Sequence, residues 1–246
     1  MSRHNWNDPS EAKQWDQNHA GLHNPLRAEQ LDILLSVIEA SFQPNQWLLD
    51  LGMGSGLVEE QLFKRIPEAR VVGVDSSTEM LKLAHERLRP YANRYETHVG
   101  DFADLDQLPL PDYSYQCVFS VQALHHLTPA QMKRAYSAIC DRLQPGGLFL
   151  LLDRIKVPSP LLWPLYQTLW QRQDRVYRSQ VAPHEGETFV EHQAIVSGRG
   201  DLPVTLDEHL AWLNEAGFVA TCLHLHGNRA LFAARKASVR SMGEKA

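Results

Sequence analysis

The sequence predicts an α/β protein in which helices cover both faces of a mostly parallel β-sheet. Short strands alternate with helices from residue 47 to residue 153, which is the pattern of consecutive βαβ units. These strands are almost continuously apolar, as expected where a sheet is buried on both faces. Near the C-terminus two more strands flank the turn at 226–229, and this hairpin spacing makes the last strand antiparallel.

Local signals set the order and the limits of these elements. Strands are expected at 47–51, 70–75, 94–99, 115–120, 148–153, 219–225 and 230–235. Helices are expected at 25–40, 57–65, 76–88, 129–143 and 205–216. Asn24 is the expected N-cap of the first helix, and Thr205 with Glu208 forms a capping-box pattern at the last.

The C-terminal hairpin is predicted to have an inner and an outer face. Successive side chains of a strand point to opposite sides, so Leu223 and Leu225 share one face and His224 and His226 the other. We expect the leucines to point into the core and the histidines to be exposed.

Length and composition indicate a single domain. The chain has 246 residues, of which 43% are hydrophobic and 22% charged, an ordinary balance for a protein with one buried core. We place this domain at 1–236, followed by a polar tail at 237–246. The regular alternation stops at 154–204, a stretch rich in proline and aromatic residues that we interpret as an irregular helical insertion after the fifth strand.

Three properties bear on partners and location. The formal net charge of -5 disfavours a nucleic-acid partner, because phosphate binding needs clustered Lys and Arg. No apolar run approaches the roughly 18 residues of a membrane span, and residues 1–10 lack the apolar core of a secretory signal. The three cysteines are scattered and odd in number, which favours a reduced, cytoplasmic setting. The oligomeric state stays open.

Residues 50–56 form a glycine-rich turn of a type that binds nucleotides. Asp50 lies at the end of a predicted strand, Gly52, Gly54 and Gly56 follow at alternate positions, and a helix comes next. Glycines permit a sharp bend and let the backbone approach a ligand with no Cβ in the way. Asp75 ends the next strand 19 residues beyond Gly56, where a ribose diol would lie.

Further motifs extend this pattern over almost the whole chain, from 22 to 235. They are LLDLGMGSG at 48–56, VDSS at 74–77, GDF at 100–102, VFSVQALHHL at 118–127, LQPGG at 143–147 and AGF at 216–218. With them the chain resembles the class I S-adenosylmethionine-dependent methyltransferases. The resemblance implies a Rossmann-like, seven-stranded sheet of order 3-2-1-4-5-7-6, with strand 7 antiparallel.

The resemblance also implies S-adenosylmethionine as cofactor and S-adenosylhomocysteine as its product. The implied cofactor-binding residues are Asp50, Gly52, Met53, Gly54, Gly56, Asp75, Ser76, Met80, Gly100, Asp101, Phe102, Ser120, Val121 and Gln122. The glycines would line the methionine and ribose, while Asp75 would bind the ribose hydroxyls. Met80 and Phe102 would flank the adenine, Asp101 would hold its amino group, and 120–122 would pass beneath the sulfonium.

One departure from the family pattern concerns the start of the fourth strand. Relatives often have an Asp there, and this chain has Gln116. The departure affects a structural hydrogen bond rather than cofactor binding.

His125 and His126 follow the fourth predicted strand, at the sheet edge where α/β enzymes bind ligands. They are the predicted catalytic residues, as general bases for an acceptor hydroxyl or amine. The structural alternative is that one of them only orients its loop. No metal is predicted, because the histidines and glutamates at 184–192 match no tight ligand spacing.

The predicted function is methyl transfer to a small-molecule acceptor, with the nucleophilic atom (O, N or C) left open. The segment 1–24 is expected to act as a lid over the cofactor, and the insertion at 154–204 to cover the acceptor site with aromatic residues such as Trp163, Tyr166 and Trp170. One alternative is a non-catalytic S-adenosylmethionine-binding protein. An RNA methyltransferase is disfavoured by the acidic charge, and a nicotinamide dehydrogenase by the Gly-x-Gly-x-Gly spacing.

Overall fold

Seven strands form one sheet, and the structure confirms their predicted order. The computed structural model describes residues 5–19, 25–180, 184 and 186–237, so Asn24 and positions 238–246 of the predicted tail lie outside the described residues. The order in the sheet is β3-β2-β1-β4-β5-β7-β6. The strands are β1 (Trp47–Leu51), β2 (Arg70–Asp75), β3 (Tyr95–Val99), β4 (Tyr115–Val121), β5 (Leu143–Arg154), β6 (Phe218–His226) and β7 (Arg229–Lys236).

The strand directions also agree with the prediction. β1 pairs in parallel with β2 and β4, β2 with β3, and β4 with β5. β7 runs antiparallel between β5 and β6. The C-terminal ends of β1 to β5 therefore lie along one side of the sheet, which we call the carboxyl edge.

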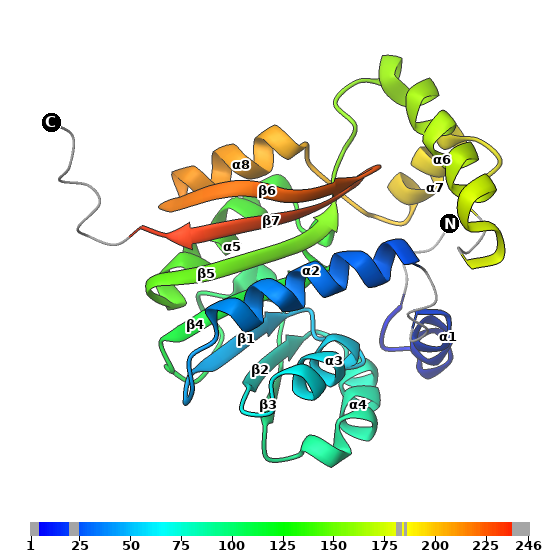
Figure 1. Ribbon diagram of the computed structural model, residues 1–246. Helices are drawn as coiled ribbons and strands as arrows, with labels where there is room; N and C mark the ends of the chain where they lie inside the picture. The colour runs from blue at the N-terminus through cyan, green and yellow to red at the C-terminus, as the bar shows by residue number, and fades with distance from the viewer. Residues whose placement is uncertain (1–4, 20–24, 181–183, 185, 238–246) are drawn as a thin grey trace, which may run out of the picture.

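Helices cover both faces of this sheet (Figure 1). They are α1 (Pro9–His19), α2 (Pro25–Ser41), α3 (Leu57–Arg65), α4 (Thr78–Arg87), α5 (Pro129–Arg142), α6 (Trp163–Tyr177), α7 (Phe189–Gly198) and α8 (Leu206–Glu215). On one face α2 and α3 bury Leu34 and Phe63, and on the other α5 and α8 bury Tyr136 and Leu213. Because a fully buried Leu or Phe contributes about 1.5–3 kcal/mol, these two apolar layers hold the helices in place.

The helix α1 was not predicted, and it lies beyond the carboxyl edge (Figure 1). Asp8 caps it, since its Oδ1 accepts from the amides of Ser10 and Glu11 at 2.8 and 3.1 Å. Arg87 of α4 forms an ion pair of 2.6 Å with Asp16 of α1. The polar N-terminal segment is therefore anchored on α4 rather than left as a loop.

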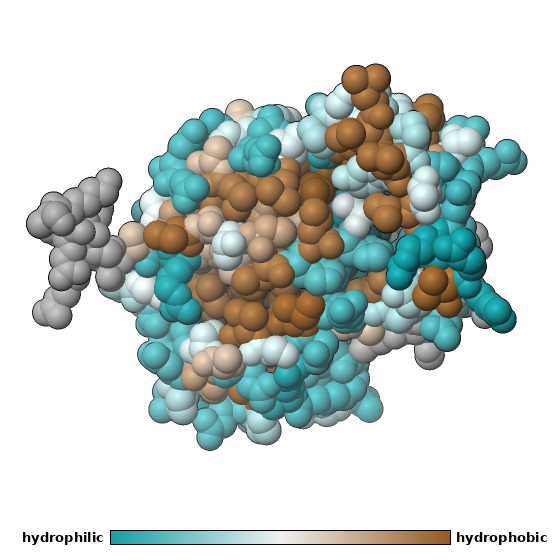
Figure 2. All heavy atoms as spheres, turned by 45° about the horizontal axis from the view of Figure 1, so that its top comes forward, coloured by the Kyte–Doolittle hydropathy of each residue, from teal (hydrophilic) through white to brown (hydrophobic). Residues whose placement is uncertain are grey.

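The insertion folds into α6 and α7, which pack on each other through aromatic rings. The Phe189 ring lies 5.1 Å from Tyr166 and 5.2 Å from Trp170, between ring centroids. These aromatic residues thus form a core within the insertion. Outside this core α6 exposes Leu165 and Leu169, which are 61% and 45% accessible, and Leu161, just before the helix, is 88% accessible. Figure 2 shows apolar side chains gathered over this part of the molecule.

In the hairpin the prediction for the inner and outer faces is wrong. Leu223 and Leu225 are 44% and 51% exposed, whereas His224 and His226 are half-buried. The cause is the phase set by Phe218, which is buried in the core at the start of β6. From there the alternation of exposure runs unbroken to His226 and leaves the odd-numbered side chains exposed, across a bulge between Cys222 and His224.

Two strand and helix limits also differ from the prediction. The fifth strand begins at Leu143, not at 148, because Leu143 already pairs with Tyr115 across an irregular register. The helix α5 consequently ends at Arg142, before the Pro-Gly-Gly at 145–147.

Gln116 makes the structural contacts expected at the start of β4. Its Oε1 accepts from the Gln43 amide at 3.0 Å, and its Nε2 donates to the Ser41 carbonyl. An amide therefore ties β4 to the loop between α2 and β1, with no carboxylate required.

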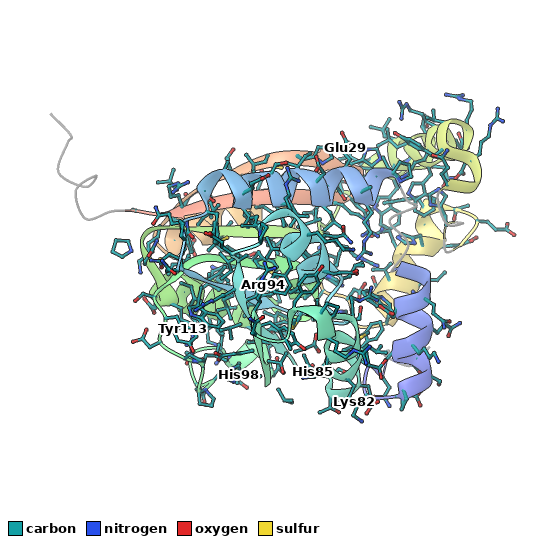
Figure 3. All side chains as sticks on the ribbon, turned by 60° about the horizontal axis from the view of Figure 1, so that its bottom comes forward. Glu29, Lys82, His85, Arg94, His98 and Tyr113 are labelled. Atoms are coloured by element: carbon teal, nitrogen blue, oxygen red, sulfur yellow. The ribbon has the colours of Figure 1, made fainter. Side chains whose placement is uncertain are left out.

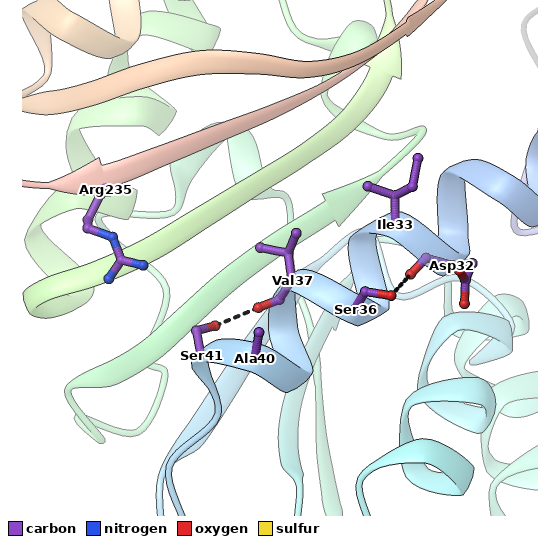
Figure 4. Close-up of a pocket in the computed structure, with 7 residues that line it drawn as sticks. All are labelled: Asp32, Ile33, Ser36, Val37, Ala40, Ser41 and Arg235. Atoms are coloured by element: carbon purple, nitrogen blue, oxygen red, sulfur yellow. Dashed lines mark hydrogen bonds between the residues drawn. The ribbon is translucent and has the colours of Figure 1, made fainter.

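A groove of about 400 Å³ lies between α2 and β7, away from the carboxyl edge (Figure 4). Arg235 lines it, and this residue pairs with Leu148 near the start of β5, at the opposite end of the sheet. The hydroxyls of Ser36 and Ser41 in its wall donate to carbonyls of their own helix. The two charged residues of the lining also have protein partners, since Asp32 pairs with Arg65 and Arg235 donates to the Gly146 carbonyl.

The outer strand β3 carries polar side chains. His85 of α4 lies 3.0 Å from the Tyr95 hydroxyl and 3.1 Å from Thr97 Oγ1, and His98 projects at the same end of the molecule (Figure 3). Polar groups along a sheet margin discourage pairing with another chain, so this margin is protected. Among the described residues no helix is long and apolar enough to cross a bilayer.

Candidate active site

Three glycines of the turn after β1 adopt left-handed backbone conformations, with φ of +89° at Gly52, +56° at Gly54 and +74° at Gly56. A Cβ on Gly52 would lie 2.3 Å from the Cβ of Ala123, so close packing excludes a larger residue. A Cβ on Gly54 would meet nothing nearer than 4.0 Å. Gly54 therefore faces open space, and this is where a ligand can approach the backbone.

The amides of the turn are already bonded within the protein. Gly52 and Met53 both donate to the Val74 carbonyl, at 2.8 and 3.1 Å. The Gly54 amide donates to Asp75 Oδ2 at 2.8 Å, and the Gly56 amide to the Met53 carbonyl at 3.2 Å. A phosphate-binding turn needs such amides free for the anion. These four amides are therefore not available to a phosphate group.

Asp75 lies half-buried at the end of β2, beside this open space. Burial raises the pKa of its carboxyl, and the amides of Ser77 and Gly54 oppose that shift. Oδ1 accepts from the Ser77 amide at 2.8 Å, which leaves lone pairs on both oxygens for further donors. The side chain is held in place and can still accept hydrogen bonds from ribose hydroxyls.

A buried pair of carboxyl groups supports the turn from below. Asp50 and Glu59 are 1% and 0% exposed, and Asp50 Oδ1 and both carboxyl oxygens of Glu59 are buried with no hydrogen-bond partner among the described residues. Burial raises the pKa of both, and the Glu59 carboxyl raises that of Asp50 further. Asp50 thus lies beneath the turn, where it can act on a ligand only through the backbone.

The N-terminal segment reaches the same place. The Ser77 hydroxyl donates to the Trp6 carbonyl, and the Thr78 amide donates to Asn7 Oδ1 at 3.0 Å. Arg87, which binds α1, also donates to the Ser55 carbonyl of the turn at 2.9 Å. Residues 5–19 therefore sit next to Asp75 and the glycine turn.

The predicted cofactor residues lie along the carboxyl ends of β1 to β4, and they differ in exposure. Those that are half-buried are Gly52, Gly54, Asp75, Gly100, Val121 and Gln122. Those that are exposed are Ser76 and Asp101. Those that are buried are Asp50, Met53, Gly56, Met80, Phe102 and Ser120.

Several of these side chains already have partners in the protein. Ser120 Oγ donates to the Leu51 carbonyl at 2.6 Å, and Met53 Sδ fills the space beside Gly73, where a Cβ would lie 2.1 Å away. Asp101 accepts from the Ala103 amide at 2.8 Å and caps a short 3-10 helix. Ser120 and Met53 therefore shape the site, and Asp101 remains exposed beside it.

His125 lies in a short 3-10 helix after β4, and it is paired with a carboxylate that sequence reasoning missed. Its Nδ1 is 2.6 Å from Asp153 Oδ1, and its amide donates to Asp153 Oδ2 at 2.9 Å. Burial opposes ionisation of Asp153, but the contacts with His125 and the Arg154 amide hold its pKa below the usual value. The available signal was an acid at the end of the fifth predicted strand.

A second carboxylate joins this cluster from the end of the insertion. Asp201 is 3.4 Å from Nδ1 of His126 and 2.8 Å from the Arg154 guanidinium. The Leu202 amide donates to the His125 carbonyl at 2.6 Å, which fastens the insertion to the loop after β4. Burial and the neighbouring His125 lower the pKa of His126 to about 4, so this imidazole is neutral near pH 7.

The ligand atoms of His125, His126 and Asp201 lie within 4.8 Å of one another, as in a metal centre. The Arg154 guanidinium already supplies the positive charge beside Asp201 that a cation would bring. In the insertion, His184 stacks on Trp170 at 4.0 Å and pairs with Asp174 at 3.0 Å, while Glu185 lies outside the described residues. These groups have protein partners of their own, so we assign no metal to them.

Comparison with known proteins agrees with this geometry. Residues 48–147 match a family model described as a methyltransferase domain. An uncharacterised methyltransferase of Synechocystis is 33% identical over 124 residues, covering 50% of this chain and 54% of that protein. A trans-aconitate 2-methyltransferase of Rhodopseudomonas palustris is 32% identical over 128 residues (50% and 46% covered). A ribosomal RNA small subunit methyltransferase H of Nocardia farcinica is 37% identical over 99 residues (39% and 30%).

A solved structure with the same fold is an O-methyltransferase family 2 protein of Planctomyces limnophilus in complex with apigenin. It has a TM-score of 0.66 and 20% identity, with 94% of this chain and 62% of that chain covered. The fold and the glycine turn define a Rossmann-like domain. Residues 48–147 match a methyltransferase domain, and the chain is similar to S-adenosylmethionine-dependent methyltransferases in sequence and in fold. It spans about half the length of the first curated relative, 54%.

Two alanine substitutions separate the structural glycine from the ligand-facing one. In Gly52→Ala the new methyl group collides with Ala123, so we expect the variant to lose several kcal/mol of stability or to fail to fold. In Gly54→Ala the methyl group has room, so the only strain is the left-handed backbone conformation at this residue. We expect this strain to lower the free energy of unfolding by about 1–2 kcal/mol. Chemical denaturation measures both. Equal destabilisation of the two variants would contradict the assignment of the open side to Gly54.

Proposed function

We propose that this protein transfers the methyl group of S-adenosylmethionine to a small-molecule acceptor at the carboxyl edge. The observation that carries the proposal is the open space over Gly54, flanked by Asp75 and by the His125 loop. When bound, the cofactor supplies a methyl group on a positively charged sulfur, which is already reactive toward a nucleophile. The protein then has to align the acceptor with that methyl group and exclude water.

The described residues fit this cofactor. Gly52, Gly54 and Gly56 would give its methionine and ribose access to the backbone, and Asp75 would accept from the ribose hydroxyls. The adenine would lie between Met80 and Phe102, with Ser76, Gly100 and the exposed Asp101 at its margin. Val121 and Gln122 would pass beneath the sulfonium. Asp50, Met53 and Ser120 are better described as positioning residues, since they hold the turn and the strand ends from below.

The competing functions are less well supported. A nicotinamide dinucleotide carries a pyrophosphate, and the turn amides that would bind it are used by Val74 and Asp75. An RNA substrate is disfavoured by the net charge of -5, although an RNA methyltransferase is among the relatives. A small acceptor is supported by the apigenin complex of the structural neighbour. We propose a cytoplasmic location, for which the three free cysteines are the support.

His125 is the residue we assign as general base. Asp153 holds its Nδ1, so that Nε2 is the nitrogen available to an acceptor proton. His126 is the weaker choice, because an imidazole with a pKa near 4 has little affinity for a proton. His125 is only 4% exposed, and the insertion that ends at Asp201 lies over it, so acceptor binding must open this contact.

The ribose assignment is tested by Asp75→Asn. The substitution keeps the shape and one acceptor oxygen but removes the charge, so we expect S-adenosylhomocysteine to bind about 10- to 100-fold more weakly, the scale of a lost hydrogen bond to a charged group. Isothermal titration calorimetry measures the affinity. Asp104→Asn, an exposed acid nearby, is the matched control. Equal affinity in the wild type and Asp75→Asn would refute the assignment.

The base is tested with an acceptor found by release of S-adenosylhomocysteine from a compound library. We expect His125→Asn to lower kcat by about 10²–10⁴-fold, because the group that takes the proton of the acceptor is removed. His126→Asn should keep the wild-type rate. If His125→Asn also keeps the wild-type rate, His125 only orients its loop. Absence of any turnover together with tight binding would favour a non-catalytic role.

We also propose that 154–204 covers the acceptor and that 5–19 covers the cofactor. The contacts of Leu202 with His125 and of Trp6 with Ser77 support these two placements. In hydrogen exchange, S-adenosylhomocysteine should protect the glycine turn and residues 5–19 first, and addition of the acceptor should then protect 163–189. Acceptor-induced protection confined to 5–19, with the insertion unchanged, would assign acceptor specificity to the N-terminal segment.

A further inference from the structure

Arginine side chains lie close together at the carboxyl edge. They are next to residues 120–122, which are predicted to pass beneath the sulfonium of the cofactor. Arg154 ends β5 and Arg229 begins β7, and the two are direct partners in the antiparallel pair. Side chains of partner residues lie on the same face of a sheet, so these guanidinium groups are neighbours. Arg27, at the start of α2, contributes a third positive charge close enough to act on Arg229.

The carboxylates of this region are engaged elsewhere. Asp153 accepts from the ring and amide of His125 and from the Arg154 amide. Asp201 is paired with Arg154 at 2.8 Å and lies near both histidines. The charge of Arg154 is thus matched by Asp201, and that of Asp153 is stabilised by His125.

Arg229 is the cation that this arrangement leaves without a counter-ion. Its hydrogen bond within the described residues goes to the neutral Oε1 of Gln122, and no described carboxylate forms an ion pair with it. Burial, with Arg154 and Arg27 nearby, lowers the pKa of Arg229 to about 9, and the smaller effects of the Asp153 and Asp201 charges oppose this shift. The bond to Gln122 uses Nη1, and the side chain as a whole is half-buried rather than sealed.

Gln122 fixes where such a ligand would lie. It follows β4 directly and has a φ of +57°, an uncommon conformation for a residue with a side chain. Its amide donates to the Leu152 carbonyl at 2.8 Å, which locks the backbone while its side chain accepts from Arg229. The guanidinium is therefore held at the end of β4, next to the residues assigned to the sulfonium.

We propose that Arg229 binds a carboxylate group of the methyl acceptor, so that the substrate class of this protein is carboxylic acids. The inference rests on the proposed methyltransferase function and adds the chemistry of the acceptor to it. A planar guanidinium presents its N–H groups in pairs, and such a pair matches a carboxylate in a bidentate geometry. A carboxylate carries one negative charge and would therefore serve as the counter-ion of Arg229.

Two other anions fit less well. A phosphate group would bring up to two negative charges near Asp153 and Asp201, which both act on Arg229, so it would be repelled more strongly than a carboxylate with its single charge. The carboxylate of the cofactor itself would lie with its methionine part over the glycine turn, on β1, whereas Arg229 is fixed to the end of β4. Both are included as arms of the test.

The experiment uses the full chain saturated with S-adenosylhomocysteine. Thermal unfolding is followed with acetate, benzoate, citrate or phosphate against chloride at equal ionic strength, in the wild type, Arg229→Gln and Arg229→Lys. Arg235→Gln is the matched control, because Arg235 lies exposed at the other end of the same strand. S-adenosylhomocysteine and methylthioadenosine, which lacks the amino-acid carboxylate, are titrated separately into each variant.

We expect at least one carboxylate to raise the Tm of the wild type and of Arg235→Gln above its value in chloride. Arg229→Gln should fold with an equal or higher Tm in chloride, because a buried excess charge is removed, and should bind the carboxylate about tenfold more weakly or worse. Arg229→Lys should retain part of the stabilisation by carboxylates, since lysine keeps the positive charge but lacks the paired N–H donors of a guanidinium.

Three results would overturn the proposal: no carboxylate effect in the wild type, an equal effect in Arg229→Gln, or stabilisation by phosphate alone. If Arg229→Gln weakens S-adenosylhomocysteine and leaves methylthioadenosine unchanged, Arg229 belongs to the cofactor site and the proposal is also wrong. Failure of the wild type to bind S-adenosylhomocysteine is a separate outcome that refutes the proposed function.

Discussion

The site depends on the hydrogen bonds that fasten the glycine turn to the neighbouring strand. Two turn amides share the Val74 carbonyl, and a third binds the Asp75 carboxylate. These bonds require β1 and β2 to be parallel neighbours, and they require left-handed backbone at Gly52 and Gly54. Since the amides are consumed internally, the turn offers a nucleoside a close approach to its backbone but no cradle for phosphate.

The same parallel pairing brings the rest of the site together. Asp75, Gln122 and Asp153 lie at or just beyond the ends of β2, β4 and β5, and a parallel sheet brings these ends to one edge. Two segments that are not part of the sheet then close over that edge. The N-terminal segment contacts Ser77, and the insertion returns through Asp201 to the His125 loop.

Most charged side chains on the acceptor side are paired with one another. One positive charge, that of Arg229, is left without a counter-ion among the described residues. Asp153 is paired with His125 and Asp201 with Arg154, at 2.6 and 2.8 Å. Arg229 is left with a neutral amide as its partner. A cation held in a partly buried place without a counter-ion is costly, so the arrangement favours an anionic ligand at that point.

The sequence alone determined the strands, the glycine turn and the place of Asp75, because periodicity, turn glycines and strand-end acids are local signals, and its resemblance to a family implied the sheet order. It did not determine the faces of β6, where the odd-numbered side chains are the exposed ones, nor the helix α1. Asp201 lies far from His125 along the chain, and Arg229 far from Gln122, and only the folding of the insertion and the hairpin brings each pair together. Their pairing depends on distances in space, which no local pattern encodes.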